Sequence, residues 1–186
     1  MAGPGPRPAV FLDRDGTLSE EIGYIRDPSR FSLFPWAGPS IRRLNESGLP
    51  AVLITNQSGV GRGYFETGLV DRIHEILTER IAMEGARLDG IYYCPHHPDA
   101  GCGCRKPRPG MLLEASRKLG LDVARSVMVG DQYTDVGAGR AAGARTILVL
   151  TGAGREQYER HGQSGPQPDH VVGDLSEAVT LILETS

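Results

Sequence analysis

Short apolar runs alternate with helix-like patterns from one end of the chain to the other. The runs have the length of buried strands and lie at 9–12, 50–55, 88–93, 126–130, 144–150 and 170–172. Strands that alternate with helices are joined by crossover connections, and crossover connections make neighbouring strands parallel. The pattern therefore predicts an α/β fold: a doubly wound, mainly parallel sheet with helices on both faces.

Helical periodicity is clearest over 67–84, where charged residues separate apolar positions and Gly85 is a stop signal. The apolar positions recur at spacings of three and four and are Val70, Ile73, Ile76, Leu77 and Ile81. This stripe predicts a helix that packs one face against the core.

Three further segments carry local signals. A helix is expected to begin after Pro109 and to end at Gly120, because proline suits the first turn of a helix and glycine its end. The sequence 174–177, Asp-Leu-Ser-Glu, resembles a capping box that opens the last helix. The segment 152–168 is rich in glycine and polar residues and is expected to be a mobile loop.

Length and charge limit the class of protein. The chain of 186 residues is long enough for one domain with its own core, expected over 9–186 after a short flexible tail at 1–8. A net charge of −3 without a basic stripe argues against a nucleic-acid partner. No apolar run approaches the roughly 20 residues of a membrane helix, so no membrane partner is expected. These features favour a cytoplasmic protein, which we expect to be a monomer.

Two carboxylates follow the first apolar run directly. An extended backbone points Asp13 and Arg14 to opposite sides, and a turn at Gly16 can bring Asp15 back toward Asp13. Two carboxylates on one substrate suit a nucleophile and a proton carrier. An ordinary Asp-Gly turn would give the same local sequence, so the interpretation depends on the rest of the chain.

Other polar clusters also follow predicted strands. They are Thr55-Asn56-Gln57-Ser58 after the second strand and 130–135, Gly-Asp-Gln-Tyr-Thr-Asp, after the fourth. In a parallel sheet, ligands bind at the carboxyl ends of the strands. We therefore expect these clusters and the two carboxylates to lie on one rim.

All cysteines of the chain fall within one short segment: Cys94, Cys102 and Cys104. Three thiolates and one imidazole form a tetrahedral donor set for zinc, and either His96 or His97 could supply the imidazole. A closed set of four protein ligands is typical of structural zinc. The alternative is a reactive surface loop with reduced cysteines.

In this order, the polar motifs resemble the haloacid dehalogenase (HAD) superfamily of aspartate-dependent phosphatases over nearly the whole chain. The superfamily's four motifs are Asp-x-Asp, Ser/Thr, Lys and Gly-Asp-x-x-x-Asp, and they match Asp13 and Asp15, Thr55, Lys106, and Asp131 and Asp135. The resemblance implies a Rossmann-like HAD fold. A cap domain is not expected, because only 37 residues separate Thr17 from Thr55 and 50 separate Thr55 from Lys106.

The resemblance also implies roles for these residues. Asp13 would be the nucleophile and Asp15 the general acid and base, whereas Thr55 and Lys106 would stabilise the phosphoryl group. Catalytic Mg²⁺ would be held by Asp13, by the backbone carbonyl of Asp15 and by Asp131. Asp135 would orient Lys106 or a water on the metal. A solvated surface lysine is the alternative for Lys106.

A zinc loop before Arg105-Lys106-Pro107 occurs in two branches of the superfamily. They are the heptose-1,7-bisphosphate 7-phosphatases and the histidinol-phosphate phosphatases, and the resemblance to the first is closer over 55–65, 88–98 and 105–111. It implies a sugar bisphosphate as substrate, a place in nucleotide-activated heptose biosynthesis, and His96 as the fourth zinc ligand. Residues expected to contact the substrate are Arg14, Glu21, Tyr24, Asn56, Gln57, Ser58, Arg62 and Arg105, with Gln132 beside them.

Two departures and three alternatives accompany this interpretation. The zinc loop is shorter than in many members of the heptose branch and closer in length to that of the histidinol-phosphate branch. Gln132 stands where lysine is common, which leaves the preferred anomer open. Arg105 is expected to bind the remote phosphate, whereas Arg62 could equally be a surface charge. Histidinol-phosphate phosphatase is the main alternative function. The other two alternatives are a zinc-knuckle binding module and a polynucleotide 3′-phosphatase. Both would need a basic surface, which this sequence does not predict.

Overall fold

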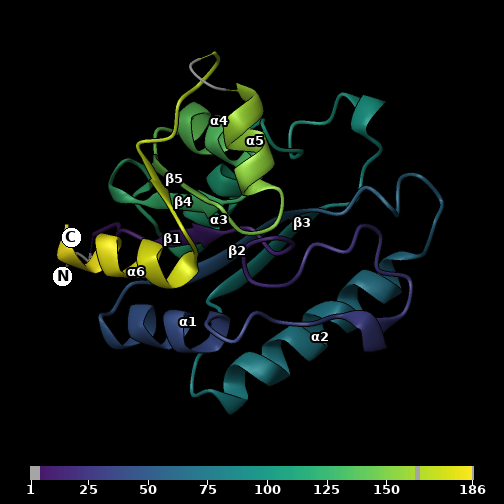
Figure 1. The fold of residues 1–186 in the computed structure, drawn as a ribbon, viewed down its shortest axis with the longest axis horizontal. Coiled ribbons are helices and arrows are strands. Elements are labelled where there is room, and N and C mark those ends of the chain that lie inside the picture. The colour runs from purple at the N-terminus through teal and green to yellow at the C-terminus, as the bar shows by residue number, and fades with distance from the viewer. Residues whose placement is uncertain (1–4, 162–163, 186) are drawn as a thin grey trace.

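Six parallel strands form one sheet in the computed structural model, which describes residues 5–161 and 164–185 (Figure 1). The strand order is β3-β2-β1-β4-β5-β6. The strands are β1 (Val10–Leu12), β2 (Ala51–Asn56), β3 (Gly90–Cys94), β4 (Val127–Gly130), β5 (Arg145–Val149) and β6 (His170–Val172). This arrangement confirms the predicted α/β class and all six predicted strand positions.

Helices cover both faces of the sheet. They are α1 (Ala37–Glu46), α2 (Thr67–Met83), α3 (Gly110–Leu119), α4 (Tyr133–Ala142), α5 (Gly154–His161) and α6 (Leu175–Glu184). One face carries α1, α2 and α6, and the other carries α3 and α4 with α5 beside them (Figure 1). The predicted helices over 67–84 and from Pro109 to Gly120 are confirmed as α2 and α3.

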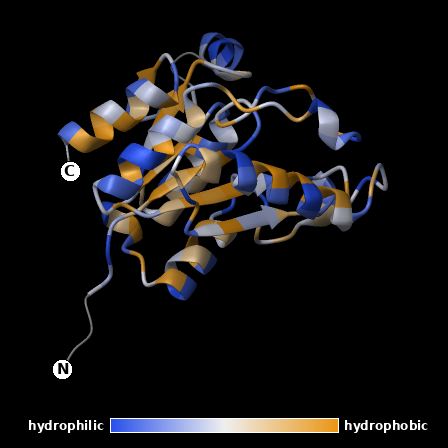
Figure 2. Cartoon of the chain, turned by 90° about the horizontal axis from the view of Figure 1, so that it is seen from below, coloured by the Kyte–Doolittle hydropathy of each residue, from blue (hydrophilic) through white to orange (hydrophobic). Residues whose placement is uncertain are grey.

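Alternation along the central strand divides the core. Val10 and Leu12 of β1 pack into the cluster under α1, α2 and α6, whereas Phe11 packs into the cluster under α3. Hydrophobic residues concentrate on the strands and on the inner helix faces (Figure 2). The buried strands therefore hold the ends of β1, β2 and β4 in fixed register.

No separate domain interrupts the described part of the chain. Residues 13–50 between β1 and β2 contain a short 3₁₀ turn and α1, and residues 57–89 between β2 and β3 contain α2. The cap-less architecture expected from these spacings is present. Within the described residues, no helix has the length and apolar character needed to span a membrane.

Two segments differ from the expectation. The segment 152–168, expected to be a loop, contains α5, whose polar surface gives no apolar periodicity and whose Glu156 and Arg160 form an ion pair one turn apart. The expected flexible tail at 1–8 lies outside the described residues at 1–4. Further along, the backbone of Arg7 bonds to Gly120 and Asp122, which anchors this end of the tail.

Candidate active site

The strand order reverses between β1 and β4, and Asp13 and Asp131 follow these two strands. Ligands bind in parallel sheets at such a switch point, outside the carboxyl ends of the strands. Both side chains are buried, with 6% and 0% of their surface exposed. Together with Asp135 they place carboxylate oxygens within 4.8 Å of one another.

Lys106 brings the positive charge to this cluster. Its Nζ lies 2.8 Å from Oδ1 of Asp13 and 2.6 Å from Oδ1 of Asp135, and it donates to the carbonyl of Ile54 at 2.8 Å. The side chain is buried, and the two carboxylates raise its pKa above the ordinary value against the opposing effect of burial. Lys106 is therefore a fixed cation and not a solvated surface lysine.

The loop before α3 is attached to the end of β2 by Asn56. Nδ2 of Asn56 donates to the carbonyl of Lys106 at 3.2 Å, and Oδ1 of Asn56 accepts from the Lys106 amide at 3.1 Å. Sequence reasoning expected Asn56 to contact the substrate. Both ends of its amide hold the Lys106 backbone, and the residue also lines the cavities above the carboxylates, so its contact with a substrate stays a prediction.

Asp131 is enclosed by a loop that sequence reasoning did not include in the site. The amide of Ala153 donates to Oδ2 of Asp131 at 2.8 Å, whereas Oδ1 is buried without a hydrogen-bond partner. Gly16 and Gly152 leave the space that this carboxylate needs, because a Cβ would lie 2.0 Å and 2.4 Å from its Oδ2, respectively. The available signal was that 151–153 follows a strand at the same sheet edge.

Burial dominates the electrostatics of the two aspartates. It raises the pKa of Asp13 to about 7, against the opposing effect of Lys106, and that of Asp131 to about 9, with further repulsion from neighbouring carboxylates. One lysine does not offset three buried carboxylates. A divalent cation fits this donor set, because carboxylate and carbonyl oxygens are hard ligands.

Asp15 lies beside the cluster and is held from two sides. Its carboxylate accepts two-pronged hydrogen bonds from the Arg14 guanidinium, the shortest at 2.9 Å, and one from Nε2 of Gln57 at 2.9 Å. The same Gln57 nitrogen donates to the Thr55 hydroxyl at 2.9 Å. The acid/base candidate is therefore tied to the phosphoryl-binding candidate.

Arg14 does not lie where a substrate contact requires. Only 1% of its surface is exposed, and its guanidinium is enclosed within the protein. The expectation that Arg14 contacts the substrate is therefore corrected. Its guanidinium contacts Asp15 and, through Nη1 at 3.2 Å, His74 of α2, a residue that no motif had singled out.

Two adjoining cavities open above the carboxylates. One of about 70 Å³ is lined by Asp13, Asp15, Thr55 and Lys106 among others, and one of about 240 Å³ extends it outward. Sequence-predicted residues that line the outer cavity are Glu21, Tyr24, Asn56, Gln57, Ser58, Arg105 and Gln132. Arg62 is not among them, since its guanidinium lies 3.5 Å from Nε2 of His97 on the neighbouring loop.

Arg105 and Tyr24 give the outer cavity its character. Nη1 of Arg105 is buried and has no hydrogen-bond partner, which leaves a charged donor for an anionic ligand. Tyr24 packs edge to face against Tyr64 at 4.8 Å, and its hydroxyl lies 3.5 Å from the hydroxyl of Ser58. The outer cavity is thus suited to a polar molecule with a second anionic group.

The three cysteines and one histidine converge between β3 and α3. Cys94 Sγ lies 3.5 Å from His96 Nδ1 and 3.1 Å from Cys104 Sγ, and Cys102 Sγ lies 3.6 Å from Cys94 Sγ. All four donor atoms lie within 4.8 Å of one another, and a set of three thiolates and one imidazole is typical of tetrahedral zinc. His97 points elsewhere, because its Nδ1 accepts from the Asp99 amide.

Known proteins resemble the chain along nearly its full length. It is 43% identical over 188 residues to a D-glycero-D-manno-heptose-1,7-bisphosphate 7-phosphatase of Thermosynechococcus vestitus, covering 95% of this chain and 96% of the relative. A D-glycero-beta-D-manno-heptose-1,7-bisphosphate 7-phosphatase of Yersinia pestis is 44% identical over 153 residues, covering 78% and 81%. The sequence profile of the HAD-hydrolase-like family matches residues 103–178.

A solved structure agrees with these sequence relatives. The D,D-heptose 1,7-bisphosphate phosphatase from B. bronchiseptica, crystallised with magnesium and phosphate, superposes with a TM-score of 0.88 at 34% identity, covering 96% of this chain and 99% of the other. The expected resemblance is confirmed. The chain belongs to the D-glycero-D-manno-heptose-1,7-bisphosphate 7-phosphatase family of HAD-like hydrolases and is a phosphoric monoester hydrolase.

Proposed function

We propose that this enzyme removes the 7-phosphate of D-glycero-D-manno-heptose 1,7-bisphosphate through an aspartyl-phosphate on Asp13, in nucleotide-activated heptose biosynthesis. The observation that carries the proposal is the contact of Asp13 with Lys106 at the floor of the cavity, with Asp15 and Thr55 on its wall. The names of the relatives support the substrate. Cytoplasmic location and a monomeric state stay predictions.

The carboxylates fit a catalytic Mg²⁺. Asp13, Asp131 and the backbone carbonyl of Asp15 would hold it, which is consistent with the unpartnered Oδ1 of Asp131 and with the raised pKa values of both aspartates. A similar structure contains magnesium. When bound, the ion supplies Lewis-acid chemistry and neutralises the repulsion between phosphate and carboxylate. Asp135 belongs to the same cluster, and its contact with Lys106 supports a role in orienting the lysine.

Each step of the proposed reaction is then assigned to a side chain in the active site. A carboxylate oxygen of Asp13 forms a bond to phosphorus while the bond from phosphorus to the sugar oxygen breaks, and Asp15 gives that oxygen its proton. Asp15 next takes a proton from the water that hydrolyses the aspartyl-phosphate. Lys106 and the Thr55 hydroxyl stabilise the negative charge on the transferring oxygens.

We further propose that Cys94, His96, Cys102 and Cys104 hold a structural zinc ion. Four protein ligands leave no open position for a substrate or water. The loop also packs on the active-site wall, since the Gln57 amide donates to the carbonyl of Cys94 at 2.8 Å. The proposed zinc therefore supports the segment that carries Arg105 and Lys106.

Arg105 is proposed to bind the remote 1-phosphate. Arg105 lines the outer cavity and its Nη1 has no hydrogen-bond partner, and a guanidinium can hold a phosphate with two parallel hydrogen bonds. Gln132 can add a hydrogen bond but no charge. The arrangement favours a substrate with two phosphates over one with a single phosphate.

Histidinol phosphate is the second candidate substrate, favoured by the short segment from Cys94 to Cys104. The deciding experiment measures phosphate release with Mg²⁺ from both anomers of the heptose bisphosphate and from histidinol phosphate. We expect the highest kcat/KM with a bisphosphate and nearly complete loss of turnover in a folded Asp13→Asn variant. Preference for histidinol phosphate would overturn the substrate assignment, and an active Asp13→Asn enzyme would overturn the mechanism.

A further inference from the structure

The buried guanidinium of Arg14 distributes its donors between two partners. Nε and Nη2 point to the carboxylate of Asp15 at 2.9–3.2 Å, and Nη1 lies 3.2 Å from Nε2 of His74. His74 belongs to α2 and is 60 residues away in sequence. A buried charge needs each of its donors satisfied, because an unpaired one carries the full cost of its desolvation. His74 therefore supplies the acceptor for Nη1, which the Asp15 carboxylate does not reach.

The chemistry of the contact fixes the state of the histidine ring. A guanidinium only donates hydrogen bonds, so Nε2 of His74 must accept and the ring proton must be on Nδ1. Burial, with a further effect of the Arg14 charge, lowers the pKa of His74 to about 3. The ring is consequently a neutral acceptor, aimed at Arg14.

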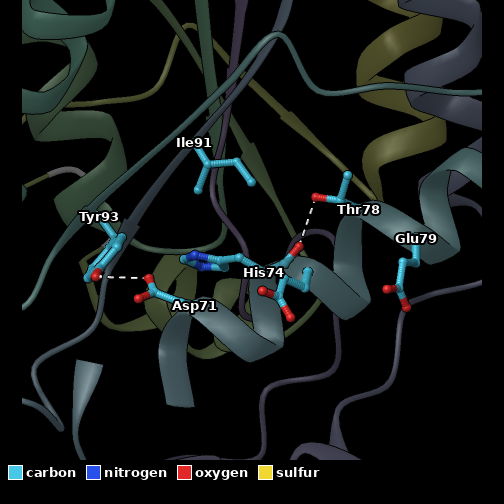
Figure 3. A pocket seen from close by; sticks show the side chains of 7 residues that line it. Asp71, His74, Thr78, Glu79, Ile91 and Tyr93 are labelled. Atoms are coloured by element: carbon cyan, nitrogen blue, oxygen red, sulfur yellow. Dashed lines mark hydrogen bonds between the residues drawn. The ribbon is translucent and has the colours of Figure 1, made fainter. Parts of the chain in front are cut away.

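The ring of His74 lies in the wall of a groove between α2 and β3. Figure 3 shows this groove, which has a volume of about 510 Å³ and shares no lining residue with the active-site cavities. His74 meets the ring of Tyr93 edge to face at 5.4 Å, and the Tyr93 hydroxyl donates to Asp71 at 3.2 Å. The acceptor is thus held by packing on an edge strand, away from the reacting atoms.

We infer that His74 and Arg14 are positioning residues that fix the Asp15 carboxylate for its proton transfers. The inference rests on the proposed function. Gln57 also donates to Asp15, but it shares the same nitrogen with Thr55 and supplies no charge. Without the His74 acceptor, Nη1 of Arg14 must form a hydrogen bond elsewhere. The guanidinium then rotates, which changes the geometry of its two-pronged contact with Asp15. Arg14 is buried and Asp15 faces the cavity, so the effect reaches the substrate only through Asp15.

If His74 positions Asp15, its loss should affect an alkyl phosphate more than p-nitrophenyl phosphate. A simple loss of packing should affect both substrates equally. Transfer of a phosphoryl group from a sugar needs a proton on the leaving alkoxide, whereas p-nitrophenolate leaves from p-nitrophenyl phosphate as a stable anion. The constant kcat/KM covers the steps up to departure of the leaving group. General acid catalysis contributes about 10²- to 10⁴-fold, and only the alkyl phosphate depends on it at this step.

The experiment compares His74→Leu, His74→Asn and His74→Gln on both substrates. The Gln oxygen can reach the place of Nε2 and accept from Arg14, whereas Asn is one methylene short and Leu cannot accept. We expect the Leu and Asn variants to lose about 10- to 100-fold in kcat/KM with the heptose bisphosphate, through kcat more than KM, and less than about twofold with p-nitrophenyl phosphate. The Gln variant should recover most of the loss. Glu79→Gln, on the same groove of α2, should match the wild type.

The outcomes separate the inference from the function on which it rests. Equal losses on the two substrates, or His74→Asn with wild-type kcat/KM on the heptose bisphosphate, would overturn the positioning role alone. A wild-type enzyme that releases phosphate from neither substrate would overturn the proposed function and this inference with it. Should His74→Leu fail to fold, the comparison of the Asn and Gln variants gives the same decision.

Discussion

The ammonium group of Lys106 lies 2.8 Å from a carboxylate oxygen of Asp13, and both side chains are buried. The contact aligns the proposed nucleophile and places a positive charge where the phosphoryl oxygens would develop negative charge. Lys106→Met should lower kcat by at least about 10²-fold, the usual effect of removing one such donor. Phosphate release at saturating Mg²⁺ measures it. Lys118→Met, the other lysine of the chain and an exposed one, is the control, and an equal loss in both variants would refute the assignment.

Stability should depend on pH in a direction set by the buried aspartates. Burial raises the pKa of Asp13 to about 7 and that of Asp131 to about 9, from values near 3.8. Between about pH 4 and 9 the folded protein therefore binds more protons than the unfolded chain. The free energy of unfolding of the magnesium-free protein should fall as the pH rises through this window.

Urea denaturation from pH 5 to 9 tests this dependence. Added Mg²⁺ should remove most of the decline, because the ion compensates the ionised carboxylates and binds only the folded state. Asp131→Asn should also flatten the profile. A magnesium-free protein that becomes steadily more stable toward pH 9 would contradict the electrostatic description of the site.

Gly152 is expected to control the affinity for Mg²⁺. A methyl group at this position would lie 2.4 Å from Oδ2 of Asp131 and equally close to the Gly16 backbone, so Gly152→Ala must displace the carboxylate. We expect at least a tenfold rise in the Mg²⁺ concentration that gives half-maximal activity. Gly143→Ala is the matched control, because Gly143 also has positive φ but open space around it. Identical Mg²⁺ titrations of the two variants would contradict the prediction.

Removal of zinc should lower activity even in excess Mg²⁺. Lys106 follows Cys104 by two residues, so a loop that lost the proposed zinc would displace the Lys106 side chain from Asp13. Cys102→Ser or chelation should therefore reduce kcat in proportion to the zinc lost, as measured by metal analysis of the same samples. Full activity in protein shown to be free of zinc would separate the loop from catalysis.

Much of the fold follows from local pattern. Strand positions were predictable because a parallel sheet buries both faces of its inner strands, so β1, β2, β4 and β5 are nearly continuous apolar runs. The helix α5 was not, because only Gly154 of its residues is buried and the helix carries no apolar stripe. Its His161 stacks on Tyr133 at 4.1 Å, and a contact between residues so far apart in sequence leaves no periodic signal.

The candidate site also contains residues that the sequence could predict and residues that it could not. The aspartates and Lys106 could be proposed because each follows a strand in a recognisable motif. The contact of His74 with Arg14 could not, because a single histidine on an amphipathic helix is indistinguishable from an ordinary buried residue. The role of Asn56 depends on which backbone its amide meets, and that is decided by the loop before α3.

Most residues that wall the outer cavity lie outside the strands of the sheet, among them Tyr24, Ser58 and Arg105. Recognition and bond cleavage are consequently separable in this scaffold. Variant libraries confined to the wall can alter which phosphorylated metabolite is admitted while the carboxylates and the core stay untouched. The protein is accordingly a practical starting point for redesigned phosphatases.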